Sequence, residues 1–138
     1  MKFVVDSNRL LAALIAKGNT RKILLSPKFS FIAPSFFFAE VDRKKDELAP
    51  RIGRPDEVDS LFALLKRDIL IISIEHYSPL IPNLEKELVD SKDIPYLACC
   101  VAAGAEGIWT HDKDFLRQER VKIFTNKDLL DYLRKGLN

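Results

Sequence analysis

Short apolar runs alternate along the chain with longer stretches in which hydrophobic positions recur at a helical period. The short runs are rich in β-branched and aromatic residues, and they predict strands at residues 2–6, 29–33, 69–73, 107–110 and 121–125. The longer stretches predict helices at residues 9–18, 21–26, 36–51, 54–68, 79–90, 93–106 and 126–138. This alternation predicts an α/β fold, a three-layer α/β/α sandwich around four or five mostly parallel strands.

Some boundaries and strand positions can also be predicted. Ser7 or Asn8 is expected to cap the first helix, and Gly18 is expected to end it. The run at residues 69–73 has the uninterrupted apolar character of a fully buried strand, whereas the run at 121–125 is typical of an edge strand. Two prolines interrupt the start of the predicted helix at residues 79–90 before Leu88 and Val89 help to restore a helical stripe.

Composition narrows the class of protein. The 138 residues suffice for one sizeable core, and no repeat, low-complexity tract or linker divides them, so we expect a single domain over residues 1–138. With 47% hydrophobic and 30% charged residues, the chain is neither disordered nor a membrane protein. The net charge of +2 neither requires nor excludes a nucleic acid partner.

Localisation is expected to be cytoplasmic, because the N-terminus lacks the apolar stretch of a signal peptide and no run is long enough to span a bilayer. The adjacent Cys99 and Cys100 lie in a predicted helix, where they would point to different sides. We interpret them as small buried residues in a reducing compartment rather than as metal ligands.

Acidic side chains stand where ligands usually bind an open parallel sheet, beyond the carboxyl ends of its strands. Asp6 follows the first predicted strand, Asp112 follows the strand at 107–110, and Asp93 opens a helix. Glu40 stands within an otherwise apolar helical stretch. Four carboxylates at one edge would repel one another unless cations neutralised them, and their hard oxygen atoms suit Mg²⁺ or Mn²⁺.

Each acid also has a purely structural interpretation. Asp6 and Asp93 could serve only as turn or capping residues. Glu40 could form a salt bridge with Arg43 or Lys44, one helical turn further on.

The segment after the strand predicted at residues 107–110 also contains acids that could be either structural residues or metal ligands. Asp114 could cap the turn that follows it, and Asp112 is the stronger candidate for a metal ligand. The hydroxyl groups of Thr110 and Ser7 could orient carboxylates or metal-bound waters. His111 could be proposed as a general base, but a single histidine in a loop is more often simply solvated.

Taken together, these motifs resemble the PIN domain, a family of small metal-dependent ribonucleases that includes the VapC-type toxins of toxin–antitoxin pairs. The resemblance spans essentially the whole chain and is carried by "VVDSN", Glu40, "DIPYLACCVAAGA" and "IWTHDKDF". It implies an acidic cluster of Asp6, Glu40, Asp93 and Asp112, with Asp114 as an auxiliary metal ligand. Asp90 could replace Asp93 as the third acid, although Asp93 directly precedes the helix that follows this acid in the family.

The site predicted in this way is that of a Mg²⁺- or Mn²⁺-dependent endoribonuclease acting on single-stranded or structured RNA. Substrate binding is assigned to Arg9, Lys113, Ser7 and Thr110. Further cations that could contact phosphates are Lys17, Arg21, Lys22, Arg43, Lys44 and Lys45. The resemblance also implies a homodimer and a small antitoxin protein as partner, with no membrane association.

Two other functions compete with this prediction. A magnesium-dependent phosphatase would also use aspartates at strand ends, but none of the five glycines forms a phosphate-binding loop. A non-catalytic RNA-binding protein could retain the acids as a structural cation site, although such a protein has no need for a cluster that repels itself.

Overall fold

The computed structural model describes residues 1–51, 55–86 and 90–135. Five strands form one sheet in the order β3-β2-β1-β4-β5, and every neighbouring pair is parallel. The strands are β1 (Lys2–Val5), β2 (Ser30–Pro34), β3 (Ile69–Ile72), β4 (Gly107–Trp109) and β5 (Ile123–Phe124). The predicted α/β/α sandwich is therefore confirmed, with all five predicted strands present and β5 at an edge as expected.

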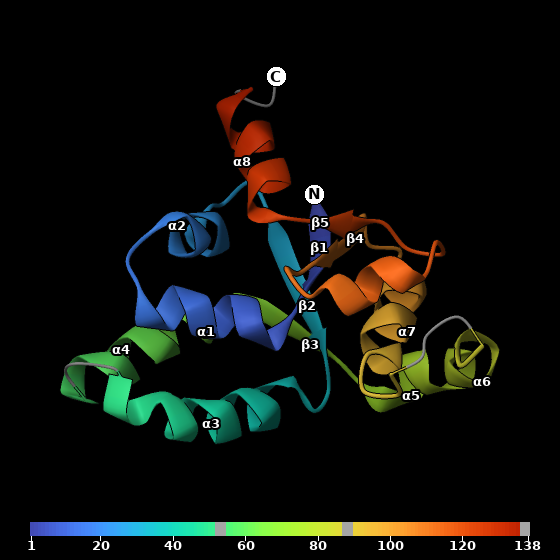
Figure 1. The fold of residues 1–138 in the computed structure, drawn as a ribbon, viewed down its shortest axis with the longest axis horizontal. Helices are drawn as coiled ribbons and strands as arrows, with labels where there is room; N and C mark the ends of the chain where they lie inside the picture. Colours follow the sequence, from blue (N-terminus) through green and yellow to red (C-terminus); the bar gives the residue numbers. More distant parts are fainter. Residues whose placement is uncertain (52–54, 87–89, 136–138) are drawn as a thin grey trace.

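Helices cover both faces of this sheet. The α-helices are α1 (Ser7–Ile15), α2 (Asn19–Leu25), α3 (Phe37–Leu48), α4 (Pro55–Lys66), α5 (Ile74–Tyr77), α6 (Ile81–Leu84), α7 (Ile94–Ala103) and α8 (Asn126–Arg134). Short 3₁₀ turns are η1 (Ala49–Arg51), η2 (Ser78–Leu80) and η3 (Lys113–Arg117). Helices α1 to α4 pack together on one side of the sheet, and α5, α6 and α7 pack on the other (Figure 1).

The central strand β1 lies in the middle of the core. Phe3, Val4 and Val5 are fully buried, and β1 pairs with β2 on one side and β4 on the other. At the β4–β5 pair, a side chain at Gly107 would collide with the carbonyl oxygen of Lys122 and the ring of Phe124. The lack of a side chain at Gly107 therefore lets β5 pair closely with β4. This pairing adds β5 to the sheet as the edge strand next to β4, the strand that the acidic segment follows.

Three local predictions were wrong. The strand predicted to be fully buried is the edge strand β3, where the side chain of Leu70 is 62% exposed. Helix α1 ends at Ile15, and Gly18 instead occupies the N-cap position of α2. Neither Ser7 nor Asn8 is the N-cap residue of α1, because Asp6 holds that position.

The irregular segment that was predicted as one helix at residues 79–90 forms the short elements η2 and α6 over its first part. The expected stripe at Leu88 and Val89 lies outside the described residues. The closing helix α8 is confirmed and begins with a capping box, in which Thr125 and Asp128 each accept a hydrogen bond from the other's backbone N–H.

Candidate functional site

Three separate segments of the chain meet at the carboxyl edge of the sheet. Strands β1 and β4 are parallel neighbours, and the backbone N–H of Asp6 donates to the carbonyl oxygen of Trp109 at 3.1 Å. Residues directly beyond both strands therefore lie side by side. The N-terminus of α7 reaches the same edge, because α7 packs against β1, β2 and β4. The acids that follow β1, follow β4 and precede α7 are thus brought together, as the sequence predicted.

Asp6 is buried, with 6% of its surface exposed, and its carboxylate is held by hydroxyl groups. Thr110 Oγ1 donates to Asp6 Oδ2 at 2.7 Å, and Ser7 Oγ donates more weakly to Oδ1 at 3.5 Å. Burial raises the pKa of Asp6, although the hydrogen bond from Thr110 and the charge of Lys44 oppose the rise. The backbone of Asn8, at the start of α1, also lowers the pKa of Asp6.

Asp93 is the most exceptional member of the group. It is 9% exposed, and its Oδ2 atom is buried without a hydrogen-bond partner among the described residues. It occupies the N-cap position of α7 but makes no side-chain capping bond. Burial, together with the negative charges of Asp90, Asp112, Asp6 and Asp114, raises its pKa to about 7. Asp93 therefore lies at the centre of a group of aspartates whose negative charges are poorly balanced by nearby positive charges.

Asp90, Asp93 and Asp114 form the tightest group, because one carboxylate oxygen from each lies within 4.8 Å of the others. The sequence left Asp90 and Asp93 as alternatives, and the structure brings both to the same place. Asp112 stands beside this group and accepts a hydrogen bond from the backbone N–H of Asp114 at 2.9 Å. Asp112, rather than Asp114, is thus the residue that caps the η3 turn.

Glu40 also lies at the site, and both of its carboxylate oxygens already interact with other side chains. Lys44 Nζ lies 3.0 Å from Glu40 Oε1, which is the salt bridge weighed from the sequence. Ser7 Oγ donates to the same oxygen at 3.2 Å, and the hydroxyl of Tyr96 donates to Oε2 at 3.1 Å. The contribution of Tyr96 was not predicted, because no spacing along the chain links it to Glu40.

The predicted substrate-binding cations differ in their surroundings. Arg9 is partly buried, and its Nε has no hydrogen-bond partner among the described residues. Lys113 is exposed on η3.

His111 is not free to act as a base through Nε2, because this atom accepts a hydrogen bond from the backbone N–H of Asn126 at 3.0 Å. Burial lowers the pKa of His111, and the nearby charge of Arg9 lowers it further.

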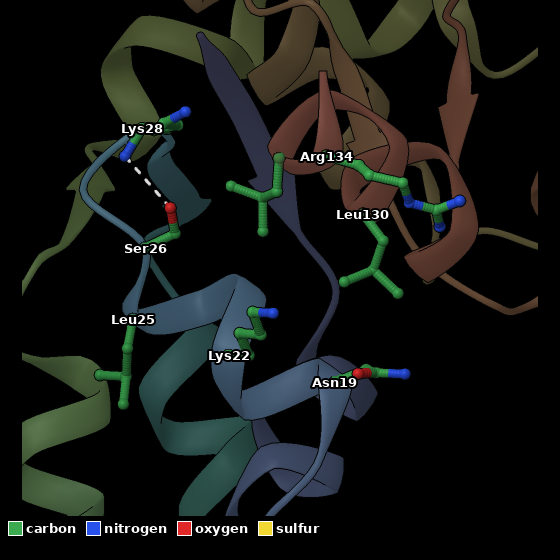
Figure 2. Close-up of a pocket in the computed structure, with 8 residues that line it drawn as sticks. Asn19, Lys22, Leu25, Ser26, Lys28, Leu130 and Arg134 are labelled. Atoms are coloured by element: carbon green, nitrogen blue, oxygen red, sulfur yellow. Dashed lines mark hydrogen bonds between the residues drawn. The ribbon is translucent and has the colours of Figure 1, made fainter. Parts of the chain in front are cut away.

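A groove of about 590 Å³ opens beside Glu40, between the starts of α3 and α7. Its other lining residues are Phe36, Ala39, Arg43, Lys44, Lys92 and Pro95. A second groove, of about 750 Å³, lies between α2 and α8, and its lining includes Lys22, Lys28, Arg134, Leu25 and Leu130 (Figure 2). The amino group of Met1 approaches the carbonyl oxygen of Lys28, so this second groove lies toward the opposite edge of the sheet from the acids.

Cys99 and Cys100 are both buried and form no disulfide, which confirms their interpretation as core residues. Burial raises the pKa of each thiol to about 12. They therefore remain protonated and unreactive near neutral pH.

Comparison with known proteins agrees with this geometry. The PIN domain family matches the chain over residues 4–133, and the chain belongs to this family of nucleases. In three dimensions the chain is similar to a chain in the structure of VapBC-1 from nontypeable Haemophilus influenzae. The TM-score is 0.61 at 16% sequence identity, over 92% of this chain and 99% of the other, which shows a shared fold. No curated protein matches the sequence. Within the described residues, no helix has the length and apolar character needed to cross a membrane.

The raised pKa of Asp93 predicts how the metal-free protein responds to pH. Its carboxyl group titrates near pH 4 in the unfolded chain and near pH 7 in the folded one. The folded state therefore binds the proton more tightly, and this residue reduces stability progressively as the pH rises from about 4 to about 7. In chelator, Asp93→Asn should gain thermal stability relative to the parent over this range, reaching a few °C by about pH 8.

Thermal unfolding at pH 4.5, 6 and 8 measures this difference. Asp46→Asn, which changes an exposed aspartate on α3, is the matched control. A difference in melting temperature between Asp93→Asn and the parent that stays constant with pH would contradict the assignment.

Proposed function

We propose that this protein is a metal-dependent endoribonuclease whose metal centre is built around Asp93. The observation that carries the proposal is the buried Oδ2 of Asp93, which has no partner within the described part of the chain and lies among four further aspartates. Native proteins rarely leave a buried polar oxygen without a partner, and a bound cation would supply one. An acidic cluster of this kind in a family of nucleases is most simply explained as a site for divalent metal.

The donor atoms suit a hard cation. Asp90, Asp93 and Asp114 offer only carboxylate oxygens, and Asp112 has a second carboxylate oxygen besides the one that caps η3. Oxygen donors of this type bind Mg²⁺ or Mn²⁺ well and bind soft metals poorly. When bound, such an ion supplies positive charge to the scissile phosphate and increases the acidity of water.

The chain's own residues favour water as the attacking group. The hydroxyl groups of Ser7, Thr110 and Tyr96 all donate to carboxylates and are thus held as positioning residues. His111 uses Nε2 to accept a backbone hydrogen bond. In the proposed reaction the oxygen of water bonds to phosphorus while the bond to the 3′ oxygen breaks. The products are a 5′-phosphate and a 3′-hydroxyl, and the leaving oxygen takes up a proton.

The groove beside Glu40 supports a nucleic acid strand as substrate. Phe36 and Pro95 give it an apolar floor against which a base can pack, and Arg43 and Lys92 place positive charge at its sides. Arg9 and Lys113 are proposed to contact phosphates on the other side of the acids. Unpaired bases are accessible to such a groove, which is why we propose single-stranded or loop RNA.

The direct test is cleavage of a labelled, mixed-sequence single-stranded RNA by the purified protein in Mn²⁺. We expect cleavage that stops in chelator and falls about 100-fold or more in Asp93→Asn, the size of effect seen when a group that supports transition-state charge is removed. The products should carry 5′-phosphates. The exposed-site variant Asp46→Asn should cut at the parental rate.

Four results would contradict the proposal. Cyclic 2′,3′-phosphate ends would mean that the RNA's own hydroxyl attacks. Equal cutting by Asp93→Asn would place the activity elsewhere. Hydrolysis of a small phosphate monoester, with RNA left intact, would favour the phosphatase alternative, while metal binding without any cleavage would favour a non-catalytic RNA-binding protein.

We also propose that the protein is a toxin of the VapC type, which forms a homodimer and is held inactive by a small antitoxin protein. The support is family membership together with the fold shared with a chain of VapBC-1. Light scattering of the purified protein should give twice the mass of one chain, and a monomeric mass at micromolar concentration would refute the homodimer. Addition of the product of an adjacent small open reading frame should inhibit RNA cleavage.

A further inference from the structure

The acidic side chains at the sheet edge divide into two halves that differ in how their charge is balanced. The first, which we call the Glu40 half, consists of Asp6 and Glu40. The second, the Asp93 half, consists of Asp90, Asp93, Asp112 and Asp114. The two halves lie close enough for Asp6 to act on Asp93 electrostatically.

In the Glu40 half, Lys44 supplies the balancing charge for Glu40, and both Lys44 and Arg9 act electrostatically on Asp6. Lys44 Nζ lies 3.0 Å from Glu40 Oε1, 3.0 Å from Ser7 Oγ and 3.3 Å from Asn8 Oδ1. Its side chain is 27% exposed and that of Glu40 is 23% exposed, so the pair is largely shielded from water. An ion pair in this setting is much less screened than one on the surface.

Lys44, Ser7 and Tyr96 also occupy three of the roughly four acceptor positions of the Glu40 carboxylate. Its Oε1 atom accepts from Lys44 and Ser7, and its Oε2 atom accepts from Tyr96. A divalent ion bound through Oε1 would have to displace the lysine, and an ion bound through Oε2 would be repelled by the lysine at close range. The Glu40 half is therefore complete without a metal.

The Asp93 half has no comparable balance. Asp93 Oδ2 is buried without a partner among the described residues. The salt bridge that the structure shows for this half joins Asp114 to Arg117 at 3.8 Å, with side chains 48% and 59% exposed. So long and exposed a pair contributes little. The need for a cation is thus concentrated on one side of the site.

We propose that Lys44 is a built-in cation that takes the place of a second metal ion, so that the chain binds one divalent ion, in the Asp93 half. This inference rests on the metal centre of the proposed function and deepens it. Lys44 is a positioning residue: it holds Glu40 and Ser7 in place and fixes the number of ions that the acids accept.

The test counts Mn²⁺ ions bound per chain, by calorimetry and by the loss of the free Mn²⁺ electron paramagnetic resonance signal. The parent should bind one ion. Lys44→Gln, which keeps similar length without the charge, should bind two, and Lys44→Arg should restore one. Lys45→Gln is the matched control, because Lys45 faces α4, where it pairs with Asp59 and lies over the ring of Phe62. This control should still bind one ion.

A second readout needs no activity and no assumption about RNA. In chelator, Lys44→Gln should melt at a lower temperature than Lys45→Gln, because it leaves a partly buried pair of acids without a counter-charge. Saturating Mn²⁺ should reverse this loss, since the second ion replaces the lysine.

The outcomes separate the two proposals. A parent that binds no Mn²⁺ would overturn the metal centre itself, and the proposed function with it. A parent that binds two ions would overturn the role of Lys44 alone, whatever the variants do. One ion in both the parent and a folded Lys44→Gln would also overturn that role while leaving the metal centre intact.

Discussion

Repulsion among carboxylates at the carboxyl edge of the sheet is the constraint on which the rest of this site depends. Parallel pairing of β1 with β4 places the residues after both strands side by side, and the packing of α7 adds a third acidic segment. The fold therefore holds together charges that would separate if they were free to move. Burial of the apolar core, in which Phe3, Ile108 and Trp109 are fully buried, supplies the favourable free energy that holds these charges together.

The protein relieves this repulsion in different ways on its two sides. Hydroxyl groups and an ammonium group satisfy Asp6 and Glu40 from within the chain. Around Asp93, residues 1–51, 55–86 and 90–135 provide little such compensation: its pKa rises to about 7, and one of its carboxylate oxygens has no partner among them. Strain of this kind is commonly retained where it serves binding or catalysis. Here it marks the place where a cation from solution would be bound most favourably.

The fold and the position of the acidic site could largely be predicted from the sequence, because buried strands and the acids that end them form a recognisable local pattern. The positions of Asp6 and Asp112 after apolar runs were enough to propose a shared edge. Exposure was harder to predict, because apolar runs look alike in central and edge strands. Leu70 is exposed on the edge strand β3, and the place of β3 at the edge is a property of the sheet order rather than of the run itself.

The side-chain contacts of Glu40 could not be predicted from local sequence patterns. Helical spacing allowed Glu40 to pair with either Arg43 or Lys44, and the position of α1 decides the choice, because Ser7 and Asn8 also bind Lys44. The hydrogen bond from Tyr96 to Glu40 joins residues 56 positions apart. Such contacts depend on how the elements pack and could not be predicted from spacing along the chain.

The measurement that tests the account most directly is anomalous diffraction at the manganese absorption edge from crystals of the protein grown with Mn²⁺. The account predicts one anomalous peak, within bonding distance of the Asp93 carboxylate and its acidic neighbours, with Lys44 still paired to Glu40. A peak bonded to Glu40 with Lys44 displaced, or no peak near Asp93, would contradict it.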